Sequence, residues 1–164
     1  MSLRFGILTL SDRSAKGERA DASGPALAEL IHAQNWSVTK QAILPDDESA
    51  IRAALIEWAD SGTVDIILTT GGTGFAPRDI TPEATRAVIQ RDAPGLAETM
   101  RAESLKKTPH AMLSRAIAGI RGRTLIINLP GSPKGAVENL QTILPVLPHA
   151  VQLLTDDPNS EASH

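Results

Sequence analysis

The chain has 164 residues, a length that fits one domain with its own hydrophobic core. Apolar residues make up 41% of it, and with two Trp, two Phe and no Tyr the core must be mainly aliphatic, which leaves little aromatic surface for base stacking. The formal net charge of −3, without a long run of Lys or Arg, argues against binding to nucleic acid, and the absence of Cys excludes disulfides and thiolate chemistry.

Strand-like and helix-like patterns alternate along the first part of the chain. Residues 5–10 are a short apolar run typical of a strand, and the polar residues 12–22 are typical of a loop. Ser23 is expected to cap the helix that follows, and residues 36–44 alternate like a strand at the edge of a sheet. Apolar residues at helical spacing between 51 and 58 predict the next helix.

Two continuous aliphatic runs, residues 64–70 and 124–129, predict strands that are buried on both faces. Between them, Thr81 is expected to cap a helix with Pro82 in its first turn. A further helix is expected over residues 96–105. The order of the elements along the chain is therefore strand and helix in alternation.

This alternation predicts an α/β fold, a three-layer sandwich with a mostly parallel central sheet. One domain is expected over residues 1–154, followed by a flexible polar tail over residues 155–164. No stretch approaches the roughly 20 apolar residues of a membrane span, and the N-terminus lacks the pattern of a signal peptide. We therefore expect a cytoplasmic protein that does not bind a membrane.

Four polar or glycine-rich segments follow the predicted strands. Ligands of an open parallel sheet bind outside the carboxyl ends of its strands, so these segments should share one rim. They are Thr9–Asp12, Pro45–Asp47, Thr69–Gly74 and Pro130–Lys134. Their convergence indicates a ligand site more strongly than any single motif does.

The glycine-rich segment places Gly71, Gly72, Thr73 and Gly74 directly after a buried strand. Glycines allow positive φ angles and bring backbone amides close to an anion such as phosphate. The segment lacks the Gly-Lys-Ser/Thr ending of a P-loop and the third glycine of the dinucleotide fingerprint, which disfavours ATP binding in the manner of those families. A tight structural turn is the alternative interpretation.

Asp46 and Asp79 are the candidate ligands of a magnesium ion on this rim. A hard cation seeks oxygen ligands and bridges them to substrate phosphates, so two carboxylates near bound phosphates suit Mg2+. Each also has a structural explanation. Asp46 and Asp47 could cap the following helix, and Asp79 could prepare the helix start at Thr81.

The turn formed by Pro130, Gly131, Ser132 and Pro133 leads into a helix that begins near Lys134. The first amides of that helix would point at the rim, with Ser132 as cap or phosphate donor and Lys134 as countercharge.

Ser114 and Arg115 offer another hydroxyl and guanidinium, although such pairs are more often structural. Ser11 and Asp12 do not indicate a serine hydrolase, because no Gly-x-Ser-x-Gly elbow surrounds Ser11. The histidines lack metal-ligand spacing, so a zinc site is not expected. They are His32, His110, His149 and His164.

Six segments, in this order and spacing, resemble the Mog/MoaB family of molybdopterin adenylyltransferases, which includes the G domains of gephyrin and of the plant molybdenum-cofactor protein. The segments are residues 9–12, 23–25, 44–46, 70–85, 111–115 and 128–133. The resemblance covers residues 4–154, nearly the whole chain.

The resemblance implies a homotrimeric α/β enzyme of molybdenum cofactor biosynthesis. Such an enzyme transfers AMP from Mg-ATP to the terminal phosphate of molybdopterin and releases pyrophosphate. By position, Asp46 and Asp79 match the family's Mg-associated catalytic aspartates, and Ser114 matches a serine tied to pterin binding.

The remaining matches are ligand-lining segments of the family. They are Ser11, Asp12, the Gly71 to Gly74 turn and the Pro130 to Pro133 turn. The molybdate-inserting domain of the fused relatives has no counterpart in this sequence, so a separate molybdate-inserting enzyme is an expected partner.

Two other functions stay open at this stage. A molybdopterin-binding or scaffold protein without turnover could share the fold, although the presence of both aspartates argues against it. A nucleotide pyrophosphatase on a related domain would release AMP from a dinucleotide without a pterin acceptor. Neither alternative explains Ser114 and Arg115 together with the full rim as well as adenylyl transfer does.

Overall fold

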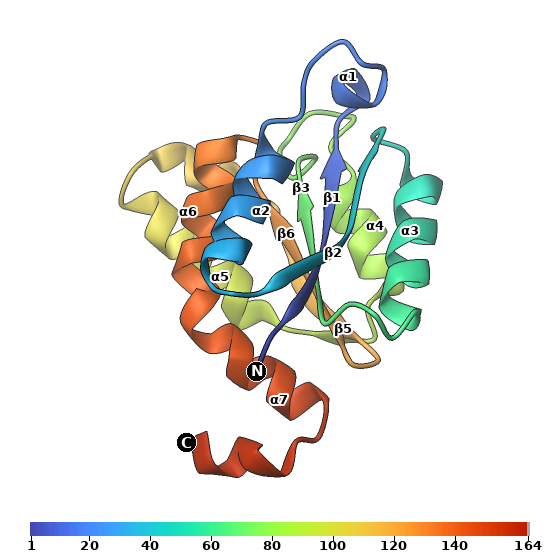
Figure 1. Cartoon of the computed structure of the whole chain (residues 1–164). Helices are drawn as coiled ribbons and strands as arrows, with labels where there is room; N and C mark the ends of the chain where they lie inside the picture. Colours follow the sequence, from blue (N-terminus) through green and yellow to red (C-terminus); the bar gives the residue numbers. More distant parts are fainter. Residues whose placement is uncertain (164) are drawn as a thin grey trace.

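A computed structural model describes residues 1–163, which form a six-stranded sheet covered by helices on both faces (Figure 1). The strand order is β2-β1-β3-β6-β5-β4. The strands β2, β1, β3 and β6 pair in parallel, and β5 pairs antiparallel with both β6 and the edge strand β4. The strands are β1 (Arg4–Leu10), β2 (Ser37–Leu44), β3 (Ile66–Thr70), β4 (Arg91–Asp92), β5 (Ala118–Arg121) and β6 (Thr124–Leu129). The predicted α/β fold with a mostly parallel sheet is confirmed.

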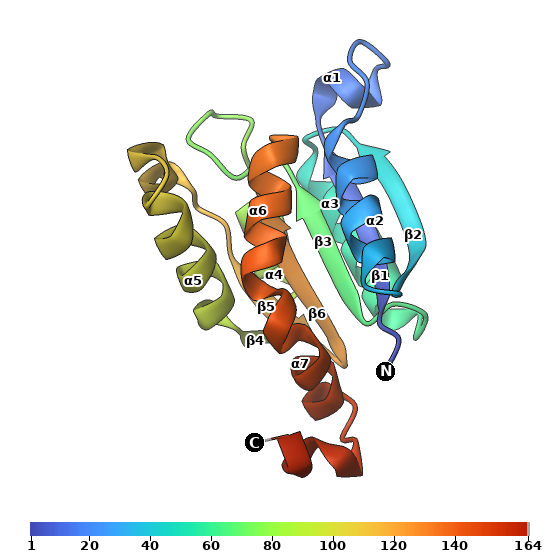
Figure 2. The same cartoon turned by 60° about the vertical axis from the view of Figure 1, so that its left-hand side comes forward.

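The helices divide between the two faces of the sheet (Figures 1 and 2). One face carries α2 (Ser23–Ala33), α5 (Pro94–Leu105), α6 (Pro133–Ile143) and α7 (Leu147–Leu154). The other carries α3 (Glu48–Asp60) and α4 (Thr81–Val88). Shorter elements are α1 (Asp12–Ala15), η1 (Pro109–Leu113), η2 (Leu144–Val146) and η3 (Pro158–Ser163). Among residues 1–163, none of the helices is both long and apolar enough to cross a membrane.

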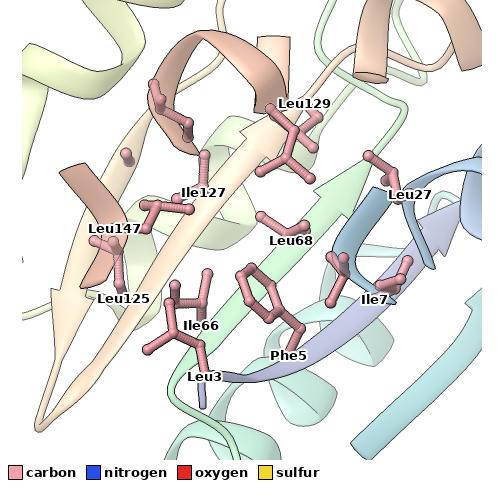
Figure 3. Packing of buried hydrophobic residues seen from close by; sticks show 14 of the residues in the cluster. Leu3, Phe5, Ile7, Leu27, Ile66, Leu68, Leu125, Ile127, Leu129 and Leu147 are labelled. Atoms are coloured by element: carbon pink, nitrogen blue, oxygen red, sulfur yellow. The ribbon is translucent and has the colours of Figure 1, made fainter. Parts of the chain in front are cut away.

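Alternate side chains of each central strand enter two separate cores. Phe5 and Ile7 of β1 pack under α2, in the larger core shown in Figure 3, whereas Leu8 of the same strand packs under α3. In β3, Ile66 and its neighbour Ile67 divide in the same way. Both faces of β3 and β6 are buried along their whole length, as their continuous aliphatic runs predict. The sheet therefore forms a rigid support for the loops at its carboxyl rim.

Several local predictions are confirmed. The strand over residues 124–129 has the predicted bounds, and β2 is an edge strand. Ser132 caps α6, with its Oγ accepting from the amide of Gly135 at 3.1 Å. Asp47 caps α3 through the amide of Ala50 at 3.2 Å.

The predicted helix caps Ser23 and Thr81 are wrong, because the hydroxyls of both residues donate to backbone carbonyls of the rim turns instead. Asp21 Oδ1, and not Ser23, accepts from the first amides of α2, those of Ser23 and Gly24, both at 3.1 Å. The Ser23 hydroxyl donates to the Gly131 carbonyl at 2.6 Å. Thr81 Oγ1 likewise caps nothing and donates to the Gly71 carbonyl at 2.9 Å. Both hydroxyls therefore hold turns at the carboxyl ends of the strands.

Regular structure also occurs where none was predicted. Within the predicted loop 12–22, α1 forms because Ser11 Oγ accepts from the amide of Ser14 at 3.2 Å. The tail over residues 155–164 contains the 3-10 helix η3, whose first turn is held by Asp157 Oδ1, which accepts from the amide of Asn159 at 2.9 Å. His164, the end of that predicted tail, lies outside the described residues.

Candidate active site

A cavity of about 660 Å³, here called the rim cavity, opens at the carboxyl ends of β1 and β3. The strand order reverses between these two strands. The chain goes from β1 to β2 on one side of β1, and then returns to β3 on the other side, from which the sheet continues to β6. Crevices at such reversal points are the usual ligand sites of open α/β sheets, and the volume is within the range for small-molecule sites. All four predicted rim segments contribute to its lining. Among the lining residues are Ser11, Asp12, Asp46, Gly71, Gly72, Asp79, Gly131, Ser132 and Pro133.

Asp46 is a partly buried carboxylate of the rim cavity, held by reciprocal hydrogen bonds to Asp12. Its Oδ2 accepts from the amide of Asp12 at 3.2 Å, and its own amide donates to Asp12 Oδ1 at 2.8 Å. Its Oδ1 is buried and has no hydrogen-bond partner among residues 1–163. Burial first, and then the charges of Asp12 and Asp79, raise the pKa of Asp46. Because Asp47 caps α3, the Asp46 side chain is left to face the cavity.

Asp79 is held by its own loop and not by the helix after it. Its Oδ2 accepts from the amide of Ala76 at 2.9 Å, and its amide donates to the Ala76 carbonyl at 2.9 Å. The first turn of α4 receives no side-chain cap from it. The structural alternatives for Asp46 and Asp79 as helix caps are therefore wrong, and both carboxylates line the same cavity.

The glycine turn owes its shape to two left-handed residues, Gly71 with φ 106° and Gly72 with φ 67°. A β-carbon on Gly71 would collide with the carbonyl oxygen of Leu10 at the end of β1. The amide of Gly71 donates to the Leu129 carbonyl at 3.1 Å, so this amide is engaged within the fold. The Gly71 amide is therefore not free to bind a ligand.

A second cavity of about 320 Å³, here called the side cavity, adjoins the rim cavity and lies between the glycine turn, η1, α5 and α6. Ser132 lines both cavities. The predicted residues in the side cavity are Thr73, Gly74, Ser114, Pro130 and Ser132. The predicted site residues thus divide between two neighbouring spaces, which suits a reaction between two different substrates.

A family model described as a probable molybdopterin-binding domain matches residues 6–149. The chain belongs to this family. It is 44% identical over 155 residues to the molybdopterin adenylyltransferase of Helicobacter pylori strain J99, covering 93% of this chain and 88% of that protein. It is 48% identical over 158 residues to the Drosophila melanogaster molybdenum cofactor synthesis protein cinnamon, covering 95% of this chain but only 26% of that protein.

Among solved structures, the molybdopterin biosynthesis enzyme MoaB from Thermus thermophilus superposes with a TM-score of 0.89 at 54% identity, covering 95% of this chain and 98% of that one. The fold of this family member is therefore that of MoaB over nearly its whole length.

Two predicted ligand residues of this molybdopterin-binding-domain family member lie outside the lining of both cavities. Lys134 is exposed at the start of α6, between Pro133 and Gly135, which each line one of the two spaces. Arg115 directs its guanidinium to the Gly74 carbonyl, the Asp79 carbonyl and the Glu83 carboxylate. The Arg115 side chain is therefore committed to contacts within the fold.

Three arginines of the rim cavity are absent from the sequence-based site. Arg13 and Arg19 come from the segment after β1, and Arg78 follows the glycine turn. They provide the local positive charge that an anionic ligand needs in a chain of net charge −3. Arg13 and Arg78 stand next to the predicted site residues Asp12 and Asp79, an adjacency that the sequence shows, whereas only the path of the chain brings Arg19 to the cavity.

Proposed function

We propose that the protein is a molybdopterin adenylyltransferase of molybdenum cofactor biosynthesis, which transfers AMP from ATP to the terminal phosphate of molybdopterin and releases pyrophosphate. The observation that carries the proposal is the meeting of Asp46 and Asp79 in one rim cavity that Arg13, Arg19 and Arg78 also line. Carboxylates for a cation beside guanidinium groups for phosphates are the components of phosphoryl-transfer sites.

Mg2+ fits the two carboxylates. The unpartnered, buried Oδ1 of Asp46 and the pKa of Asp46, raised by burial and by neighbouring carboxylates, both describe a position that a cation would stabilise. Asp46 and Asp79 would hold the ion together with oxygens of the triphosphate. When bound, Mg2+ supplies positive charge against the α-phosphate and the leaving pyrophosphate.

The side chains of the rim cavity position the nucleotide in this proposal. Arg13, Arg19 and Arg78 contact the triphosphate, and the backbone after Gly71 approaches it closely. The side cavity, with Ser114 in its wall, takes the pterin. Ser132, which lines both cavities, lies where the pterin phosphate and the nucleotide meet.

The reaction needs no covalent intermediate with the protein. A pterin phosphate oxygen forms a bond to the α-phosphorus of ATP in line with the breaking bond to the bridging oxygen of pyrophosphate, which leaves with the electron pair. The contribution of the protein is orientation and charge compensation.

The assembly and the partners also belong to the proposal. The family resemblance supports a homotrimer, a cytoplasmic location and a separate molybdate-inserting enzyme as the acceptor of the product. Sedimentation equilibrium tests the first of these, since a trimer has three times the chain mass of 17.4 kDa.

The test is to incubate the protein with molybdopterin, ATP and Mg2+ and to measure adenylylated pterin and pyrophosphate. The wild type should form both, and Asp46→Ala and Asp79→Ala should lower the rate by about 100-fold or more. Asp47→Asn is the matched control, since it removes the adjacent charge but keeps a good helix cap, and it should stay close to wild type.

Each alternative has its own outcome. Undiminished activity in both alanine variants would overturn the metal assignment. Tight molybdopterin binding by the wild type without any product would favour a binding or scaffold protein. Release of AMP from a dinucleotide without pterin would favour a pyrophosphatase.

A further inference from the structure

We propose that Arg115 is a positioning residue that holds the Asp79 loop in its catalytic geometry and contacts neither substrate. The inference rests on the proposed function, because the geometry in question is that of a proposed magnesium ligand. It replaces the ligand-binding role that the sequence suggests for Arg115.

Arg115 joins the two ends of the loop that carries Asp79. Its backbone amide donates to the Thr73 carbonyl at 2.8 Å and its Nε to the Gly74 carbonyl at 2.7 Å, both at the start of the loop. Its Nη2 donates to the Asp79 carbonyl at 2.7 Å, at the end of the loop. One side chain thus fixes the separation of residues 74 and 79.

Glu83 fixes the orientation of the guanidinium group. Its two carboxylate oxygens accept from Arg115 Nη1 at 2.7 Å and from Nη2 at 3.1 Å, a two-point ion pair. Four of the five guanidinium N–H groups then have partners within the protein. This leaves little capacity for a phosphate or a pterin, and the side chain lies outside the lining of both cavities.

The backbone on either side of Arg115 is held from α5. Arg101 Nη1 donates to the carbonyl of Ser114 at 3.0 Å and to that of Ala116 at 3.2 Å. Ser114 is the proposed pterin-side serine, so this stretch connects the side cavity to Asp79. A displacement of the guanidinium would move Asp79 through its backbone while leaving its carboxylate chemistry intact.

Lysine cannot reproduce these contacts, because an ammonium is a point charge with three donors and no planar fork. We expect Arg115→Lys to lower kcat by about 10- to 100-fold, the usual effect of removing a partner that orients a metal ligand. The KM for molybdopterin should change little. Arg115→Ala should show the same defect and recover part of its rate when millimolar guanidinium chloride is added.

Arg121→Lys is the matched control. Arg121 makes an equivalent two-point ion pair with Asp60 and donates to the Val88 carbonyl at 3.0 Å, but it lies outside the lining of both cavities and at the other end of the sheet. The Arg121→Lys variant should keep wild-type kinetics. This result would show that the defect of Arg115→Lys comes from displacement of the Asp79 loop and not from the loss of any buttressing arginine.

A binding measurement supplements the kinetics. Mn2+ replaces Mg2+ as a paramagnetic probe, and its dissociation constant is measured by electron paramagnetic resonance with α,β-methylene-ATP present. Arg115→Lys should weaken Mn2+ binding by about tenfold, in the range known for partners of metal ligands. Arg121→Lys should not change it.

Unchanged Mn2+ binding in Arg115→Lys, or an effect confined to the KM of one substrate, would overturn the proposal and restore a ligand-contacting role. If Arg115→Ala does not fold, the lysine variant decides alone. An inactive wild type would count against the proposed function, whereas the Mn2+ comparison would still decide the role of Arg115.

Discussion

Gly72 and Thr81 lie too close together to accept a β-carbon on residue 72. The amide of Thr81 donates to the Gly72 carbonyl at 3.1 Å, and a β-carbon would collide with Thr81 Oγ1 and approach Asp46 Oδ1 to 3.2 Å. The glycine turn is therefore packed between the start of α4 and the Asp46 carboxylate. Glycine at this position serves the construction of the site as well as the approach of an anion.

We expect Gly72→Ala to destabilise the fold through both strain and collision. Backbone strain at its φ of 67° costs about 1–3 kcal/mol, and the collision adds to this cost. Gly62→Ala is the control, because Gly62 has φ 73° but a β-carbon there would meet no atom of the described residues within 4 Å. In urea unfolding, Gly72→Ala should lower the free energy of unfolding clearly more than Gly62→Ala does. Equal losses in the two variants would contradict the steric argument.

Asp46→Asn should stabilise the protein at neutral pH. Because the pKa of Asp46 is raised in the folded state, the native protein binds this proton more tightly than the unfolded chain does. The free energy of unfolding therefore falls as pH rises from the ordinary value of 3.8 through the raised pKa.

The amide variant removes this penalty and should gain up to about 1 kcal/mol at pH 7, or roughly 2–4 °C in Tm. The gain should vanish at pH values below 3.8. Thermal unfolding of both proteins across pH, without divalent cations, tests this. A difference in Tm between the two proteins that does not change with pH would show that packing, and not the charge of Asp46, causes the effect.

Asn128→Ala should be strongly destabilising. The fully buried Asn128 amide donates to Thr69 Oγ1 and Thr85 Oγ1, both at 2.9 Å, and its Oδ1 accepts from the amide of Ile117 at 3.2 Å. Loss of these partners should cost about 2–4 kcal/mol. Asn139→Ala, which removes one part-buried bond to Ser104, should cost about 1 kcal/mol in the same urea titration.

Asp21→Ala should weaken the start of α2, whereas Asp21→Asn should not. Asp21 accepts from two helix amides through Oδ1 and from Thr9 Oγ1 at 2.8 Å through Oδ2. Asn and Asp are comparable caps, and replacement by Ala costs about 0.5–2 kcal/mol. Differential scanning calorimetry compares the variants, and an equal loss in both would show that charge matters more than cap geometry.

Local patterns were sufficient for much of the fold. The bounds of β6, the edge position of β2 and the cap of α6 at Ser132 follow from neighbouring residues alone, because burial period and cap chemistry act within a few positions. The short antiparallel strands β4 and β5 carry too few residues for such a pattern, and they were missed.

The hydroxyls of Ser23 and Thr81 show where local reasoning fails. Each stands at a helix start and has the chemistry of a cap, yet each binds a carbonyl of a distant turn, at Gly131 and Gly71. A hydroxyl can satisfy either partner, and only the approach of the turn decides between them.

The candidate site likewise combines features that the sequence predicts with features that depend on tertiary contacts. The sequence by itself determined that Asp46, Asp79 and the glycine turn share one rim, because the ends of parallel strands meet at one edge of a sheet. Only the tertiary structure decided that Arg115 reaches Asp79 across 36 positions of chain. It also placed Ser114 in a separate cavity. Contacts between distant segments depend on how the helices pack against the sheet, and no pattern within either segment carries that information.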